Sequence, residues 1–490
     1  MNSMKLLLIS IVMWIAAGTT SGQTYTIVDT GQIRCYDNRT EITYPEAGAA
    51  FFGQDAQYNG NEPNYRANGD GTVTDVNTGL MWQADPGEKK TYAQAAAGAA
   101  QCRTSGYDDW RLPTIKELYS LILFCGTDPD PTSRNGSSRT PFIDGDFFQF
   151  QYGKASDGER IIDSQWATCT LYKGKVMRNA EAMFGVNFAD GRIKGYPTTR
   201  GQGGGAKKFY VLYVRGNTNY GKNDFVDNED GTITDRATGL TWMKADSAAL
   251  EAGSQGDGKL NWQEALKWAE DLKYAGHHDW RLPNAKELHS IVDYARSPDV
   301  THSAAIDPLF EATPIENEGG ETDYAHYWSS TSHRRAHSAG AGVYIAFGRG
   351  LGFMARRGSP SGSKTLIDVH GAGAQRSDPK SGDLSALPEG RGPQGDVVRI
   401  YNLVRCVRGG VAEPRKKGPN VEMKNSPRRR PGADFVRRLD SNSDGKISRQ
   451  EFDGPPDHFD RFDTNGDGYL SEDEAPGSPP PDRGRRIRRR

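Results

Sequence analysis

An internal duplication limits, more than any other feature, how this chain can fold. The segment Asp70–Trp82 (DGTVTDVNTGLMW) recurs as Asp230–Trp242 (DGTITDRATGLTW). Asp109–Leu118 (DWRLPTIKEL) recurs as Asp279–Leu288 (DWRLPNAKEL). Because both blocks recur in the same order, the chain contains two homologous units. The period is far longer than that of a solenoid, so a solenoid architecture is excluded.

Two shorter matches complete each unit. Gln165–Thr170 (QWATCT) answers Tyr327–Ser332 (YWSSTS), and Val214–Gly216 answers Val407–Gly409. The second unit has Cys406 before this ending, and the first unit has no cysteine there. We place the two units at residues 23–216 and 217–410.

The repeated blocks are typical of scaffold rather than of a reactive site. Asp-Gly before an alternating Thr-Val-Thr or Thr-Ile-Thr run predicts a hairpin turn that leads into a strand. Thr114 with Glu117, and Asn284 with Glu287, fit the capping box that begins a helix. The blocks therefore indicate strands as well as helices. The alternative is that the arginine of each DWRLP block contacts a ligand directly.

The composition excludes several classes of protein. Lys and Arg number 61 and Asp and Glu 63, so no overall positive charge favours nucleic acid as a partner. Mean hydropathy is −0.73, and no segment reaches 18 consecutive apolar residues. A transmembrane segment is therefore not expected. The 58 glycines indicate loop-rich units with small cores.

The N-terminus has the pattern of a signal peptide, which we place at residues 1–22. Lys5 provides the positive start, Leu6–Ala17 is apolar, and small polar residues follow. We therefore expect an exported protein, at the cell surface, outside the cell or in the periplasm. Export makes disulfides available to the cysteines, and Cys102 with Cys125 is the favoured pair. The five cysteines are Cys35, Cys102, Cys125, Cys169 and Cys406.

The DGT, WRLPxxxEL, WSST and RCVRG blocks together resemble the C-terminal domain of bacterial collagen-like adhesins, a domain of unknown function. The resemblance covers about residues 25–410 as two copies. It implies an α+β fold, with two units similar to C-type lectin-like and sulfatase-modifying domains, and a role in binding glycans or cell-surface partners. The chain has no Gly-X-Y tract, so the resemblance does not extend to a collagen-like trimer.

Three functions remain open at this stage. The first is non-catalytic binding or adhesion to a polysaccharide or a surface partner. The second is an exported enzyme on a sulfatase-modifying-like scaffold, and the third is a purely structural part of the envelope or matrix. No Gly-x-Ser-x-Gly elbow and no convincing nucleophile–base pair occur in the sequence, so we expect no enzyme activity.

The strongest chemical signal is a pair of loops that resemble EF-hands. DSNSDGKISRQE (440–451) and DTNGDGYLSEDE (463–474) place oxygen donors at the positions that a calcium loop uses, with glycine at the sharp turn. A hard dication needs six to eight oxygens, and a twelve-residue loop can gather them. We expect two Ca²⁺ sites. The predicted ligands are Asp440, Asn442, Asp444, Lys446, Ser448, Glu451, Asp463, Asn465, Asp467, Tyr469, Ser471 and Glu474.

The segments that flank the two loops are charged, and the connection between the loops is short. A basic linker (411–433) precedes the EF-hand pair (434–475), and an Arg-rich tail (476–490) follows it. Only residues 452–462 separate the loops, and Gly454-Pro455-Pro456 interrupts them. The α-helical pair must therefore depend on calcium for order. Its small expected core contains Phe435, Leu439, Phe452, Phe459 and Phe462.

Overall fold

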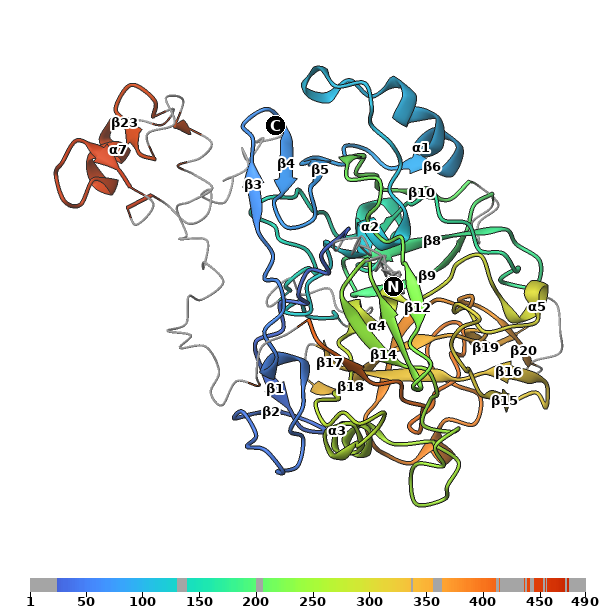
Figure 1. Cartoon of the computed structure of the whole chain (residues 1–490). Coiled ribbons are helices and arrows are strands. Elements are labelled where there is room, and N and C mark those ends of the chain that lie inside the picture. The colour runs from blue at the N-terminus through green and yellow to red at the C-terminus, as the bar shows by residue number, and fades with distance from the viewer. Residues whose placement is uncertain are drawn as a thin grey trace, which may run out of the picture. The chain divides into compact units, whose positions relative to one another are not determined.

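The chain divides into two compact units, Met1–Gly418 and Pro419–Arg490. Both repeats lie in the first of these units, so they do not form separate bodies. The predicted signal peptide, the tail and all of the linker except Pro414 lie outside the described residues. The computed structural model (Figure 1) describes residues 24–129, 139–199, 206–335, 338–355, 364–410, 414, 436, 439–440, 445–452, 454, 456–471 and 474–475.

Each repeat contains a four-stranded sheet of the same design. In the first repeat the order is β11-β5-β4-β3, and in the second it is β12-β13-β14-β22. The Asp-Gly turns form as predicted, because Asp70 and Asp230 each accept a 2.6 Å bond from the threonine hydroxyl two residues later. The strands are β3 (Tyr65–Ala67), β4 (Thr72–Asp75), β5 (Leu80–Gln83), β11 (Val214–Gly216), β12 (Phe225–Asp227), β13 (Thr232–Asp235), β14 (Leu240–Met243) and β22 (Val407–Arg408).

Short helices follow these sheets, and the two that the sequence predicts, α2 (Ile115–Tyr119) and α4 (Ala285–Ser290), begin at the expected residues. Their capping boxes are both formed. The helix α1 (Tyr92–Gly98) in the first repeat is shorter than α3 (Trp262–Asp271) in the second. The four-residue helix α5 (Pro298–Thr301) lies beyond α4. The unit is mostly β-sheet with few helices.

A single six-stranded sheet joins the two repeats. Its order is β17-β18-β21-β9-β8-β7, so three strands of the second repeat continue three strands of the first. The two halves meet where β21 pairs antiparallel with β9, Gln375 opposite Ile193. Strands of both repeats can be followed in Figure 1. The strands are β7 (Gln165–Trp166), β8 (Ala182–Asn187), β9 (Arg192–Pro197), β17 (His326–Arg335), β18 (Ser338–Ala346) and β21 (Gln375–Pro379).

Reciprocal contacts between α2 and α4 show that the repeats are related by an approximate two-fold axis. Lys116 Nζ donates to the carbonyl oxygen of Ser290 at 2.7 Å. The equivalent Lys286 Nζ donates to the carbonyl oxygen of Ser120 at 2.8 Å. A two-fold rotation therefore exchanges the two contacts, as in the self-complementary interface of a symmetric dimer. The two repeats pack like the halves of such a dimer.

One match between the repeats differs from the sequence alignment by one residue. The sequence aligns Trp166 with Trp328, but Trp166 bridges Tyr210 in the same way that Tyr327 bridges Leu403. Trp166 and Tyr327 therefore occupy equivalent places. Side chains alternate between the faces of a strand, so a shift of one residue moves the tryptophan to the opposite face.

Several two-stranded ribbons and short turns complete the large unit. In the first repeat β9 pairs with β8. In the second repeat the strand that pairs with β18 is β21, because the hairpin β19/β20 lies between β18 and β21 in the sequence. The remaining strands are β1 (Cys35–Tyr36), β2 (Glu41–Ile42), β6 (Lys90–Thr91), β10 (Lys208–Phe209), β15 (Pro314–Glu316), β16 (Thr322–Tyr324), β19 (Leu351–Ala355) and β20 (Lys364–Asp368). The 3-10 turns are η1 (Asp55–Gln57), η2 (Ala99–Gln101), η3 (Thr104–Gly106), η4 (Ala155–Asp157) and η5 (Leu384–Ala386).

The expected disulfide between Cys102 and Cys125 is not formed. All five cysteines are free. The Cys102 thiol instead lies 3.4 Å from Gln83 Nε2 and from Thr104 Oγ1, in contact with side chains of the first repeat. Within the described part of the chain, no helix has both the length and the apolar character needed to cross a membrane.

The described residues of the C-terminal unit include two short strands and the helix α7 (Pro456–Phe462). Strands β23 (Ile447–Ser448) and β24 (Tyr469–Leu470) pair antiparallel, with Ile447 opposite Leu470. The seven-residue helix lies between them in sequence. The small core contains Val436, Leu439, Ile447, Phe452, Phe459, Phe462, Leu470 and Ala475. Phe435, which the sequence adds to this core, lies outside the described residues.

Candidate functional site

An open cleft of about 560 Å³ lies where the two repeats and their connecting segment meet. One wall is the DWRLP block and α2 of the first repeat, and the opposite wall is the loop after α4. The connecting segment 218–225 forms the third side. The lining residues are Arg111, Leu112, Thr114, Ile115, Lys116, Glu117, Cys169, Thr170, Thr218, Tyr220, Gly221, Lys222, Asn223, Phe225, Ile291, Val292, Asp293, Tyr294, Ala295 and Asp307.

The charged groups on the α2 wall are held in place by bonds within the protein. Arg111 pairs with Glu117 at 2.6 Å, and 30% of the Arg111 side chain is exposed. Lys116 Nζ donates to Asn223 Oδ1 at 2.7 Å, and burial lowers the pKa of Lys116 to about 8. Asn223 in turn donates to Asp235 Oδ2 at 2.8 Å. The wall is therefore preorganised and presents a partly exposed guanidinium.

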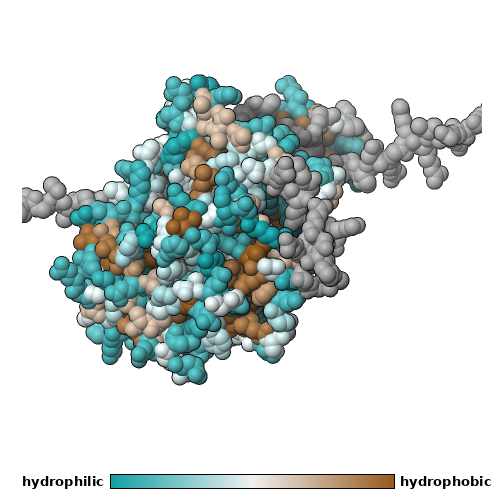
Figure 2. Space-filling model, turned by 90° about the vertical axis from the view of Figure 1, so that its right-hand side faces the viewer, coloured by the Kyte–Doolittle hydropathy of each residue, from teal (hydrophilic) through white to brown (hydrophobic). Residues whose placement is uncertain are grey.

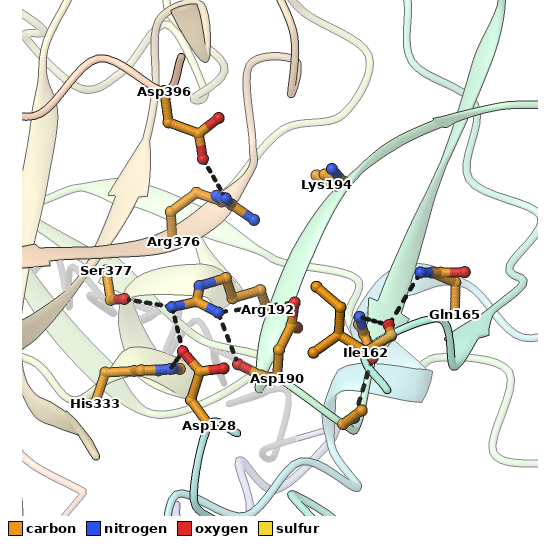
Figure 3. Close-up of polar contacts among 12 residues, drawn as sticks. Asp128, Ile162, Gln165, Asp190, Arg192, Lys194, His333, Arg376, Ser377 and Asp396 are labelled. Carbon is orange, nitrogen blue, oxygen red and sulfur yellow. Dashed lines mark hydrogen bonds and ion pairs between the residues drawn. The ribbon is translucent and has the colours of Figure 1, made fainter. Parts of the chain in front are cut away.

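A second group of charges is buried where the two halves of the six-stranded sheet meet (Figure 3). Arg192 of β9 donates to Asp128 Oδ2 at 2.8 Å and to Ser377 Oγ of β21 at 3.1 Å. His333 Nε2 lies 3.4 Å from the same Asp128 oxygen. Arg376, opposite Arg192, pairs with Asp396. Because these partners come from both repeats, the network ties the repeats together.

Burial sets the charge state of this network. Burial and the nearby Arg192 charge lower the pKa of His333 to about 3, so its ring is neutral at pH 7. Burial raises the pKa of Asp128, but Arg192 and His333 outweigh that effect and lower the net pKa. Around His333, the network is therefore the positive guanidinium of Arg192 facing the carboxylate of Asp128, with a neutral imidazole beside them. This arrangement suits a structural ion pair.

In their described residues, the two acidic loops share several hydrogen bonds. Asp440 Oδ2 accepts from the backbone of Gly445 at 2.8 Å, and Asp463 Oδ2 accepts from that of Gly468 at 3.0 Å. Each glycine has a φ near +80°, the left-handed conformation that glycine tolerates best. In a calcium loop this conformation allows the sharp turn at position 6.

The closing glutamates also occupy matching places. Glu451 accepts from the backbone of Ser448, and Glu474 accepts from that of Ser471. The described residues contain no group of three or more acidic, histidine or cysteine side chains in metal-binding geometry. Asn442 and Asp444 lie outside those residues, so the first ligand set is described only in part. The calcium assignment stays a prediction.

The cleft is a site that the sequence did not predict. It forms between Thr170, the connecting segment and the loop at Tyr294, which are far apart along the chain. The sequence signal at this site is Arg111 of the DWRLP block, for which direct contact with a ligand is the alternative interpretation. The sequence alone does not distinguish Arg111 from Arg281, because the two blocks are nearly identical.

The family profile of the Lcl C-terminal domain matches residues 71–215 and 231–362, together more than half of the chain. The chain belongs to the Lcl C-terminal domain family. The two matches confirm the tandem arrangement that the repeated blocks predict. No curated protein and no solved structure matches the chain. The first Lcl C-terminal domain carries the α2 wall of the cleft, and the second carries the loop at Tyr294.

Proposed function

We propose that the protein is an exported, non-catalytic binding protein in which the tandem Lcl C-terminal domains hold a glycan or another surface partner. The C-terminal unit binds two calcium ions. Membership of the Lcl family supports an adhesin-like role. The observation that carries the proposal is the open cleft, because its volume lies in the range of ligand sites and its polar groups converge on one space.

The surface of the large unit is mixed in character. On the face shown in Figure 2, hydrophobic residues lie in separate small patches among hydrophilic ones. Leu171, which directly follows the cleft residue Thr170, is 52% exposed. Single exposed apolar side chains are normal on a protein surface, so the proposal rests on the cleft rather than on Leu171. We include in this proposal that the two units are related to C-type lectin-like domains.

The calcium part rests on the loops themselves. Their donors are carboxylate, amide, hydroxyl and backbone oxygens, which are the ligands that Ca²⁺ prefers. The pairing of Ile447 with Leu470 supports the assignment, because position 8 of each loop is where paired EF-hand loops contact each other. Bound calcium would neutralise the converging carboxylates and hold the two loops around their small core. Calcium would then be structural.

Calorimetric titration of the mature chain with calcium chloride tests this assignment. We expect two sites with dissociation constants of roughly 10⁻⁴–10⁻³ M, the range of extracellular EF-hand modules. Glu451→Gln should weaken one site and Glu474→Gln the other, because each removes one of two oxygens that a single carboxylate offers. Glu229→Gln, in a turn of the second repeat, is the matched control and should change neither site. Absence of heat up to 10 mM, a concentration about tenfold above that range, would reject calcium binding.

A glycan array and a pull-down of envelope polymers, both with calcium present, test the surface partner. Binding to defined glycans that weakens with Arg111→Ala would place the ligand in the cleft. Retention by envelope polymers that is indifferent to this change would favour a purely structural role instead. Turnover of a bound glycan would favour the enzyme alternative.

A further inference from the structure

The open cleft of the first repeat has a counterpart in the second repeat. The approximate two-fold axis relates Arg111 to Arg281, Lys116 to Lys286, and the loop after α4 to the loop after α2. Matching backbone bonds fix the register of these loops: Leu123 N donates to Phe142 O as Asp293 N donates to Ala305 O. Phe124 is therefore the counterpart of Tyr294. By the same reasoning, the backbone of Ile115 donates to Thr170 Oγ1 as that of Ala285 donates to Thr331 Oγ1.

The counterpart site is filled by the chain's own N-terminal segment, residues 24–62. The carbonyl oxygen of Asp29 accepts from Lys286 Nζ at 2.8 Å, and that of Thr30 accepts from Phe124 N at 2.7 Å. Both partners have equivalents in the wall of the open cleft. An extended stretch of main chain therefore occupies the second site.

Side chains of the same segment complete the filling. Thr331 donates its hydroxyl to Asp55 Oδ2 at 2.6 Å, and the ring of Tyr58 lies 5.4 Å from the Arg281 guanidinium. As a result, only 4% of the Arg281 side chain is exposed, against 30% for Arg111. The N-terminal segment thus places a carboxyl group against Thr331 and an aromatic ring against Arg281. The open cleft has the equivalent residues, Thr170 and Arg111.

Two of the equivalent groups of the open cleft have no such partner, whereas Lys116 already donates to Asn223 Oδ1. Among the described residues, none accepts from the backbone N–H of Tyr294, whose counterpart Phe124 binds Thr30. Likewise, no described residue accepts the hydroxyl proton of Thr170, whose counterpart Thr331 binds Asp55. A main-chain donor, a hydroxyl donor and a partly exposed guanidinium therefore face the cleft in the arrangement that holds the segment in the second repeat.

We propose that the open cleft binds an extended polypeptide segment of a partner protein, one that carries a carboxyl group and an aromatic residue. This inference rests on the proposed binding function and names the class of its ligand. A second copy of the chain is not the source. Each copy has one such segment, and that segment already fills its own second repeat.

A labelled synthetic peptide with the sequence of residues 24–62 tests the inference by fluorescence anisotropy against the full chain. We expect saturable binding. Arg111→Ala and Thr170→Val should each weaken it at least about tenfold, because each removes a charged or hydrogen-bonding contact. Thr170→Ser keeps the hydroxyl and should restore affinity. The peptide with Asp55→Asn and Tyr58→Ala should bind at least about tenfold more weakly. Val76→Ser, an exposed change outside the cleft lining, is the control.

Two results would overturn the inference. One is no binding of the peptide. The other is binding that Arg111→Ala and Thr170→Val leave unchanged, since the peptide would then be replacing the built-in segment in the second repeat. A glycan array run on the same proteins separates this failure from that of the proposed function. Glycan binding without peptide binding rejects only the peptide, and the absence of both rejects the surface-binding function as well.

Discussion

Glu117 and Glu287 show how one side chain can serve several parts of a repeated motif. Glu287 pairs with Arg281 at 2.6 Å and accepts from the backbone of Asn284 at 2.9 Å. Arg281 in turn donates to the carbonyl oxygen of Gly409, at the end of the repeat. The motif thus joins the approach to the helix, the helix start and the last strand. In the first repeat the same bonds leave Arg111 partly exposed, so one scaffold motif also contributes to a cleft.

The buried histidines make stability depend on pH. Burial lowers the pKa of His333 and of His370 to about 3, whereas an unfolded histidine titrates near 6.5. The unfolded chain therefore binds protons first as the pH falls. Stability is complete above about pH 6.5 and decreases as the pH falls towards 3.

Replacing His333 with phenylalanine should reduce this acid sensitivity. Urea unfolding between pH 6 and 4 should show a free energy of unfolding that falls less steeply, by up to about 1.4 kcal/mol per pH unit, than in the unaltered protein. His278→Phe, at an exposed position, should leave the slope unchanged. Equal slopes for the unaltered protein and His333→Phe would mean that His333 is not buried as a neutral ring.

At the scale of elements, the packing of α3 on β18 depends on a missing side chain. A Cβ at Gly342 would lie 2.7 Å from Trp262 Cδ1, closer than atoms can approach without movement. Trp262 is fully buried and its indole donates to the carbonyl oxygen of Ser329 at 2.8 Å, so the ring has little freedom to move. The close approach of helix and strand therefore requires glycine.

Gly342→Ala should lower the free energy of unfolding by about 1–3 kcal/mol through overpacking. Gly145→Ala is the matched control, because a Cβ there meets nothing within 4 Å. Chemical denaturation with far-UV circular dichroism measures both. A Gly342→Ala protein as stable as the control would show that α3 can shift away from the sheet.

At the scale of the whole molecule, the two Lcl C-terminal domains are halves of one folding unit. They share the six-stranded sheet, the buried charges around Arg192 and the reciprocal bonds of Lys116 and Lys286. The N-terminal segment adds a further link, since Gln32 exchanges two hydrogen bonds with the backbone of Ser332. Separating the domains would expose an open sheet edge and unpaired buried charges.

Fragments 23–216 and 217–410, produced as separate chains, should therefore associate one to one. Size-exclusion chromatography should give a complex that elutes with the uncut 23–410 chain, and each fragment alone should aggregate or remain unfolded. Two folded fragments that elute as monomers and do not associate when mixed would contradict the shared sheet.

The sequence predicted local structure well where the signal is local. The turns at Asp70 and Asp230 and the capping boxes at Thr114 and Asn284 form as expected, because each depends on bonds between residues a few positions apart. The same locality explains why the alignment of Trp166 with Trp328 is wrong. Only pairing with distant strands determines which face of a strand a residue occupies, and the sequence match ignored that pairing.

By itself, the sequence determined that the chain is a duplication in the Lcl family and where the repeated Asp-Gly turns and the helices α2 and α4 begin; the calcium ligands stay a prediction. The tertiary structure decided that the duplicates form one sheet, that Cys102 stays free, and that Arg111 faces an open cleft while Arg281 lies beneath the chain's own N-terminal segment. The physical reason is distance along the chain. Nearly identical motifs fold alike, but what covers each one is supplied by segments far away in sequence.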